Sequence, residues 1–227
     1  MARPTLGSLL RGLRSRLGMT LKQMSDRTGI PYSTLSKVEH DRLTLTYDKL
    51  QQISERLNVR MSELLSEPER ASHPSANGRR SIGEMASSLH IPTRNYDHFY
   101  VSSELRNKHM IPIISRILTP SLDAFGPLVK HSGEEVAYVI EGRVEVHTEF
   151  YEPVVLKPGQ SIYLDSTMGH AYILAPGCSE ALIITVNSSS QEDLMNSAKP
   201  IRAERARRAA PATQPARKRT PRRKGRG

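Results

Sequence analysis

The spacing of hydrophobic residues changes once along the chain, from a helical period near the amino end to a period of two beyond residue 97. In that second part, short runs rich in Val, Ile and Tyr are separated by Gly, Pro, Asn or Asp. The candidate strands cover residues 98–105, 110–118, 135–142, 143–150, 152–156, 161–165, 170–174 and 181–186. This number of short strands within about ninety residues predicts a sandwich or a small barrel.

Residues 21–39 predict two short helices joined by a tight turn. Thr20 can cap the first helix, and Gln23 three residues later completes a capping-box pattern. Gly29 stands where the chain must turn sharply, because glycine tolerates the left-handed conformation of such a corner. Pro31 suits the start of the next helix, where its missing N–H has no cost.

The second of these helices has two different faces. Leu35 and Val38 point to one side, and the opposite side carries only hydroxyl and basic groups: Tyr32, Ser33, Ser36 and Lys37. Such side chains can read the hydrogen-bond donors and acceptors of bases in the major groove. The alternative is a helical hairpin that merely packs, but its outward face would usually carry acidic residues.

The segment GIPYSTLSKVE, residues 29–39, resembles the helix-turn-helix of the XRE (phage-repressor-like) family. The resemblance covers residues 6–65 and implies a five-helix, lambda-repressor-like DNA-binding domain. It puts Tyr32, Ser33 and Lys37 at base edges, with Thr34 and Ser36 nearer the DNA backbone. The implied core positions are Leu9, Leu13, Leu17, Met24, Leu50, Ile53, Leu57, Met61, Leu64 and Leu65.

Two further stretches, residues 131–142 and 158–172, resemble the paired motifs of the cupin superfamily. The resemblance covers residues 98–187 and implies an all-β double-stranded β-helix (jelly-roll) barrel. The fold class expected for the whole chain is therefore α + β, with an amino-terminal helical domain followed by a carboxy-terminal cupin barrel.

The cupin resemblance also implies a metal site formed by His131, Glu135 and His170. His131 and Glu135 differ by an even number, so both can face the same side of an extended strand. Two imidazoles and a carboxylate can hold one divalent ion of iron, nickel, manganese or zinc. The first histidine of the family motif falls at Val129, so the usual four-ligand site is not available.

Together these two parts resemble transcription regulators that join an XRE head to a cupin sensor. We expect a sequence-specific DNA-binding regulator, a repressor rather than an activator, whose barrel senses a small-molecule effector with the help of the metal. The expected partners are double-stranded DNA, the effector and a second copy of the chain, because one recognition helix contacts too few base pairs for useful specificity. No enzymatic activity is expected. The alternative is a cupin-type mononuclear metal-dependent oxygenase or epoxidase with an accessory helix-turn-helix domain.

The predicted organisation is a DNA-binding domain over 1–66, a linker over 67–96, a cupin domain over 97–187 and a disordered basic tail over 188–227. A single cysteine, Cys178, excludes an intrachain disulfide and fits a reducing, cytoplasmic location. The sequence contains no apolar segment approaching the roughly 20 residues that span a bilayer, so no membrane partner is expected.

The net charge of +10 is concentrated in the tail. Residues 199–227 contain twelve Lys or Arg and one acidic residue, Glu204. Residues 1–65 are mildly basic, which fits contact with phosphates, whereas residues 66–198 are acidic overall, which argues against DNA binding there. We hypothesise that the tail adds non-specific affinity for DNA; the alternative is a solvated charge run without a partner.

Overall fold

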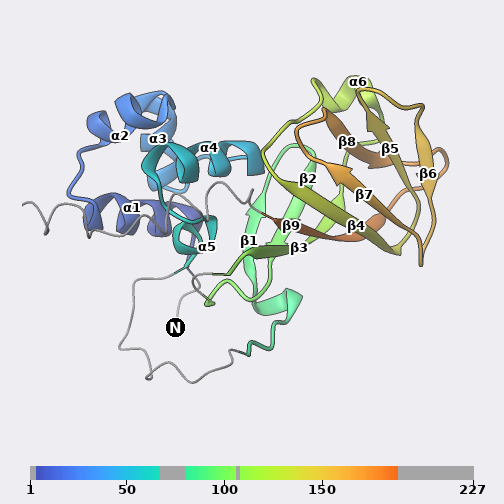
Figure 1. Ribbon diagram of the computed structural model, residues 1–227, viewed down its shortest axis with the longest axis horizontal. Helices are drawn as coiled ribbons and strands as arrows, with labels where there is room; N and C mark the ends of the chain where they lie inside the picture. Colours follow the sequence, from blue (N-terminus) through green and yellow to red (C-terminus); the bar gives the residue numbers. More distant parts are fainter. Residues whose placement is uncertain (1–3, 67–79, 106–107, 189–227) are drawn as a thin grey trace, which may run out of the picture.

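The computed structural model describes residues 4–66, 80–105 and 108–188. Residues 67–79 of the predicted linker and all but the first residue of the predicted tail lie outside these ranges. A helical domain packs beside a β domain (Figure 1). Within the described ranges, no helix has both the length and the apolarity needed to cross a bilayer.

The helical domain contains the five predicted helices, α1 (Leu6–Arg16), α2 (Leu21–Thr28), α3 (Tyr32–Glu39), α4 (Tyr47–Leu57) and α5 (Met61–Leu64). Both hydrogen bonds of the Thr20–Gln23 capping box are present, so this start signal is confirmed. Gly29 ends α2 with φ of +73°, the left-handed conformation predicted for it. The prediction that Leu17 belongs to the core is wrong. Leu17 is 38% exposed, because α1 ends at Arg16 and the chain turns away from the core there.

A buried ion pair ties α1 to the end of α3. The side chain of Glu39 is 3% exposed, and the Arg14 guanidinium donates to both of its carboxylate oxygens over 2.6 and 2.9 Å. Around this pair the α1, α3 and α4 side chains form the domain core, including Leu10, Leu35 and Ile53. The pair therefore fixes the far end of α3 to a helix that is itself held by apolar packing.

The β domain contains strands β1 (Leu89–Pro92), β2 (Tyr96–Tyr100), β3 (Met110–Ile117), β4 (Glu134–Glu141), β5 (Val144–Thr148), β6 (Val154–Leu156), β7 (Ser161–Asp165), β8 (His170–Leu174) and β9 (Ala181–Ser188). They form a six-stranded antiparallel sheet in the order β1-β2-β3-β9-β4-β7 and a three-stranded sheet in the order β6-β5-β8. The eight predicted strands are all present, which confirms the barrel-like domain.

The β domain begins earlier than predicted. β1 and the start of β2 lie inside residues 67–96, which the Pro- and Gly-rich composition predicts to be a linker. β1 is short and ends at Pro92, yet Leu89 and Ile91 are both buried. Two further elements are short: the 3-10 helix η1 (Met85–Ser87), inside the range predicted to be a linker, and α6 (Leu122–Phe125), where the sequence predicts no helix.

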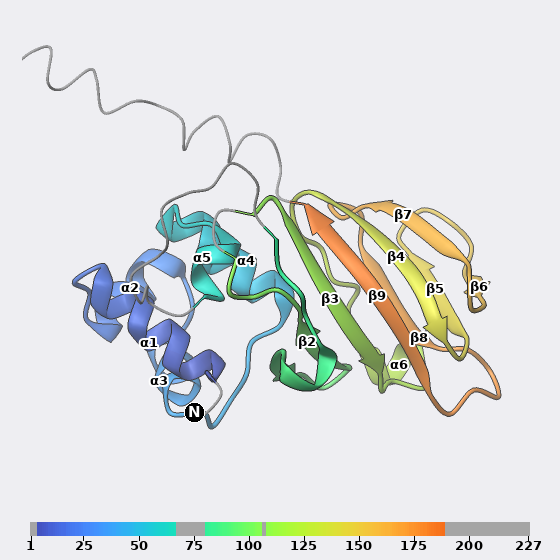
Figure 2. The same ribbon diagram turned by 90° about the horizontal axis from the view of Figure 1, so that it is seen from below.

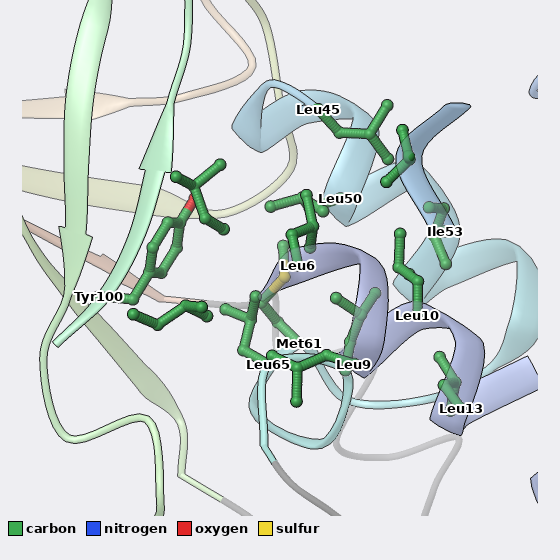
Figure 3. Packing of buried hydrophobic residues seen from close by; sticks show 14 of the residues in the cluster. Leu6, Leu9, Leu10, Leu13, Leu45, Leu50, Ile53, Met61, Leu65 and Tyr100 are labelled. Carbon is green, nitrogen blue, oxygen red and sulfur yellow. The ribbon is translucent and has the colours of Figure 1, made fainter. Parts of the chain in front are cut away.

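The six-stranded sheet is wider than the sheet that covers it. The three-stranded sheet packs on the inner face of β4, β7, β9 and the end of β3. On β1, β2 and the start of β3, the inner face packs instead against the helical domain, as Figure 2 shows from below. Figure 3 shows Tyr100 of β2 pointing toward a cluster of leucines from the helices. One apolar core is thus shared by the two domains.

Removal of Arg14 tests the buried ion pair. Arg14→Ala leaves the buried carboxylate of Glu39 with only the longer contact from Arg11 Nε, at 3.8 Å, so the loss of stability should reach at most roughly 3 kcal/mol. We expect urea unfolding to show a loss of this size. Arg16→Ala, at an exposed position of the same helix, should change the free energy of unfolding little. Equal stability of the two variants would contradict this role of the pair.

The buried imidazole of His98 makes stability depend on pH. Burial lowers the pKa of His98 to about 4, and Ser115 Oγ lies 2.8 Å from its Nδ1. The unfolded chain binds this proton near pH 6.5, so stability should fall as the pH drops from about 6.5 to about 4, by up to about 1.4 kcal/mol per pH unit. His98→Gln should remove this contribution from the slope, measured by denaturant unfolding across that range. His109→Gln, at an exposed site, should keep the full slope.

Candidate functional site

The outward face of α3 is open to solvent in the part that sequence predicts to meet DNA. Tyr32 is 54% exposed, Ser33 and Lys37 are exposed, and Thr34 and Ser36 are half-buried. Leu35 and Val38 are fully buried, which confirms the predicted division between the two faces. All the predicted DNA-contacting side chains therefore lie on an accessible surface; their individual contacts with bases stay a prediction.

Side-chain hydrogen bonds hold the turn in front of α3. Ser25 Oγ donates to the carbonyl of Ile30 over 2.7 Å, and Thr28 Oγ1 donates to the carbonyl of Met24 over 2.7 Å. From α4, Gln52 Nε2 donates to the carbonyl of Thr28 over 2.8 Å. These bonds fix the angle between α2 and α3, which is what a helix needs if it is to enter a groove in one orientation.

The three predicted metal ligands come together inside the barrel. Their ligand atoms all lie within 4.8 Å of one another, and each side chain is at most 6% exposed. His131 Nε2 lies 3.6 Å from one Glu135 oxygen, and His170 Nε2 lies 3.7 Å from the other. His131 comes from the loop before β4, Glu135 from β4 and His170 from the start of β8.

The second nitrogen of each histidine has a backbone partner. His170 Nδ1 lies 2.9 Å from the carbonyl of Met168, and His131 Nδ1 lies 3.3 Å from that of Ser132. A carbonyl at Nδ1 selects the tautomer whose Nε2 lone pair is free for a metal. With both Nε2 atoms directed at one carboxylate, the residues fit a divalent cation of the kinds predicted.

Glu135 carries its negative charge in a buried environment. Burial alone would raise its pKa, but the neighbouring imidazoles of His131 and His170 outweigh burial, so the pKa lies below its ordinary value. The hydroxyl of Tyr172 also donates to one Glu135 oxygen. The site thus presents an anionic ligand at neutral pH.

A cavity of about 100 Å³ opens beside the three ligands. Its wall is largely apolar and aromatic, formed by Phe125, Tyr96, Tyr172, Ile113, Ile183 and Val129 among others. Val129, which stands where the family motif has its first histidine, is therefore part of the wall. The amide oxygen of Asn187 is buried and has no hydrogen-bond partner within residues 4–66, 80–105 and 108–188.

Sequence reasoning missed several residues of this cavity. On β2, His98 lies on the same inward face as Tyr100, two residues later. On β9, Asn187 lies on the same inward face as Ala181 and Ile183. A polar side chain at the inward position of an otherwise apolar strand is a signal that could have identified both. The helical domain contributes Thr46, Tyr47 and Asp48, for which no local signal exists.

Family comparisons recognise both domains. A helix-turn-helix domain model matches residues 7–69, and a cupin domain model matches residues 120–187. The HTH-type transcriptional regulator PuuR of Escherichia coli strain K12 is 23% identical over 166 residues, covering 73% of this chain and 85% of PuuR. The (S)-2-hydroxypropylphosphonic acid epoxidase of Streptomyces wedmorensis is 26% identical over 99 residues, covering 41% of this chain and 50% of the epoxidase.

A solved structure has the same overall fold. The crystal structure of an HTH_3 family transcriptional regulator from Vibrio cholerae superposes with a TM-score of 0.51 at 17% identity, covering 82% of this chain and 95% of that one. Along this chain, the family matches put the helix-turn-helix domain before the cupin domain, and the match to PuuR covers most of the chain. The two domain matches, together with the match to PuuR over 73% of this chain, support a DNA-binding transcription regulator with an amino-terminal helix-turn-helix domain and a carboxy-terminal cupin domain.

Proposed function

We propose that this regulator is a repressor that recognises an operator through α3 and changes its hold on DNA when a small molecule fills the cupin cavity. The observation that carries the proposal is the pairing of an open, non-acidic recognition face on α3 with a cavity beside the His131–Glu135–His170 cluster of the cupin domain. A head placed over a promoter blocks polymerase sterically, which makes repression the expected sign. Because its target is DNA, we place the protein in the cytoplasm.

At the operator, Tyr32, Ser33 and Lys37 contact base edges, while Thr34 and Ser36 contact the backbone. The amino-terminal part of a recognition helix is the part that reaches bases in this class of DNA-binding domain. The hydrogen bonds at Thr28 and Ile30 support this geometry, since they keep α3 in one orientation.

The protein acts as a homodimer through the outer face of its six-stranded sheet. Tyr138 and Tyr163 are 44% and 61% exposed on neighbouring strands, with Val136 and Ile140 beside them. Exposed aromatic and aliphatic groups gathered on one sheet face are typical of an interface. A second copy is the occupant that operator recognition calls for, because two heads read two half-sites.

The effector is a small molecule with an apolar body and one hydrogen-bond donor. The cavity volume of about 100 Å³ lies below the ~300–1,000 Å³ of pockets for drug-sized ligands. Its aromatic wall favours an apolar body, and the amide oxygen of Asn187 requires a donor. Burying this oxygen without a partner costs about 1–3 kcal/mol, which a suitable effector would recover.

His131, Glu135 and His170 hold one divalent metal ion, of iron, nickel, manganese or zinc. A bound cation supplies Lewis acidity, which favours effectors with an oxygen or nitrogen atom that can coordinate the metal. The protein groups supply orientation: the carbonyl of Met168 positions His170, and Tyr172 holds the carboxylate of Glu135.

A metal-dependent oxygenase or epoxidase is the second candidate. The observation favouring it is the partial match to the Streptomyces epoxidase together with the His–Glu–His cluster. The match to PuuR covers 85% of that regulator, whereas the match to the epoxidase covers half of that enzyme. We therefore propose a regulator without catalytic activity.

Lys37→Ala tests DNA recognition. If Lys37 makes a good base contact, its loss should weaken binding to an operator selected from genomic fragments by about 1–3 kcal/mol, roughly 5- to 150-fold. Fluorescence anisotropy at fixed salt measures the affinity. Random duplex should be affected less, because phosphate contacts carry no sequence information.

Lys157→Ala is the matched control, because it removes the same charge at an exposed site of the barrel. It should leave operator affinity unchanged. The same titration gives the stoichiometry, expected to be two protomers per operator. Equal operator affinities for Lys37→Ala, Lys157→Ala and the parent protein would reject the assigned role of Lys37, and an enzyme would show no operator preference at all.

The metal site is tested by a double variant, His131→Ala with His170→Ala. Dialysis against iron(II), nickel, manganese or zinc followed by elemental analysis should find one ion per parent chain and none in the variant, since a single carboxylate is a poor chelator. His109→Ala, an exposed histidine, should retain the ion. Equal metal content in all three proteins would rule out this ligand set.

A further inference from the structure

Helix α4 of the DNA-binding domain touches the metal-ligand cluster directly. The ring of Tyr47, the first residue of α4, packs edge-on against the ring of His131, with 4.8 Å between the ring centroids. The two residues belong to different domains, and α4 lies next to the barrel in Figure 1. His131 is therefore in contact with both its partner ligands and the DNA-binding domain.

The next turns of α4 hold the loop that carries His131. Gln51 Nε2 donates to the carbonyl of Ser132 over 3.0 Å, and the Ser132 hydroxyl donates to Glu55 Oε1 over 2.6 Å. Tyr47, Gln51 and Glu55 are spaced four residues apart, so they form one stripe along the helix. This stripe faces the barrel over two turns.

The other sides of α4 belong to the DNA-binding domain. Leu50 and Ile53 are completely buried in its core, and Figure 3 shows them directed at the leucines of α1. Gln52 bonds the carbonyl of Thr28, the last residue of α2, just before the turn into α3. A displacement of α4 would therefore act on the recognition helix through both contacts.

The cavity beside the metal ligands is completed by this helix. Thr46, Tyr47 and Asp48 line it together with barrel residues such as His131, Glu135 and Asn187. Without α4, the cavity would lose the wall that Tyr47 supplies. Conversely, a molecule in the cavity meets a surface that belongs to the DNA-binding domain.

We infer that the effector site is shared between the domains: Tyr47 and its neighbours in the DNA-binding domain form one wall, so whatever occupies the cavity contacts both domains at once. This rests on the proposed function, in which an effector occupies that cavity. Effector binding and operator binding can then be coupled directly, because a single helix, α4, contacts the effector and also supports α3. By linkage, operator binding changes effector affinity by the same factor as effector changes operator affinity.

A tryptophan placed in the wall tests the shared site. The chain has no tryptophan, so Tyr47→Trp introduces a single indole whose emission reports its surroundings. The probe is Co²⁺, which quenches indole emission at close range. We expect one equivalent of Co²⁺ to remove most of the emission of Tyr47→Trp, and to remove little when His131→Ala and His170→Ala are added.

Ile82→Trp is the control, because Ile82 is 87% exposed and lies outside both the cavity wall and the sheet face assigned to the dimer. Its emission should be insensitive to one equivalent of Co²⁺, and acrylamide should quench it far more than the tryptophan of Tyr47→Trp. Circular dichroism checks folding. If Tyr47→Trp does not fold, Asp48→Trp, at a half-buried position of the cavity wall, replaces it in both measurements.

Unchanged emission of Tyr47→Trp while dialysis shows Co²⁺ bound would overturn the shared site. If Co²⁺ does not bind, the metal proposal fails separately, and acrylamide quenching tests the shared site. Protection of the tryptophan of Tyr47→Trp relative to that of Ile82→Trp supports the shared wall, and equal accessibility overturns it. No step uses DNA, so a failure of operator recognition leaves the result readable.

Discussion

The uncovered part of one β-sheet governs the arrangement of this protein. Six strands face only three, so the inner side of β1, β2 and the start of β3 needs another cover. Leaving such apolar surface in water costs roughly 25 cal/mol per Å². The helices supply that cover, which makes the DNA-binding domain part of the β domain's core rather than a separate body on a tether. The position of α4 at the cavity follows from this packing.

Local signals in the sequence were sufficient to predict the helices and strands, but not how the two domains pack together. The Thr20–Gln23 cap, Gly29 and the alternation along β4 and β9 each act within a few residues, and each was predicted correctly. β1 was missed because four residues ending in proline resemble a linker; its burial depends on helices that come earlier in the chain. The prediction that Leu17 is a core residue was wrong for the opposite reason. The helical spacing of leucines continues to Leu17, but the helix itself ends at Arg16.

The candidate site shows the same division. The three predicted ligands were found from a family motif, and the fold brings them within 4.8 Å of one another. His98 and Asn187 required knowledge of which strand face is inward. Tyr47 required knowledge of how two domains meet, and no periodicity in the sequence carries that information. Residues that line a cavity from a neighbouring domain are therefore the hardest to predict from sequence.

The shared apolar core also limits how such proteins can be recombined. A barrel whose own strands covered the whole six-stranded sheet could be joined to many different DNA-binding domains, and a linker would be the only requirement. Here a foreign head would have to reproduce the leucine-rich surface against Tyr100 and the aromatic contact at His131. Chimeras that exchange whole domains between distant relatives would expose both faces. New ligand specificities in this architecture are then expected to arise by substitution within the cavity rather than by shuffling of modules.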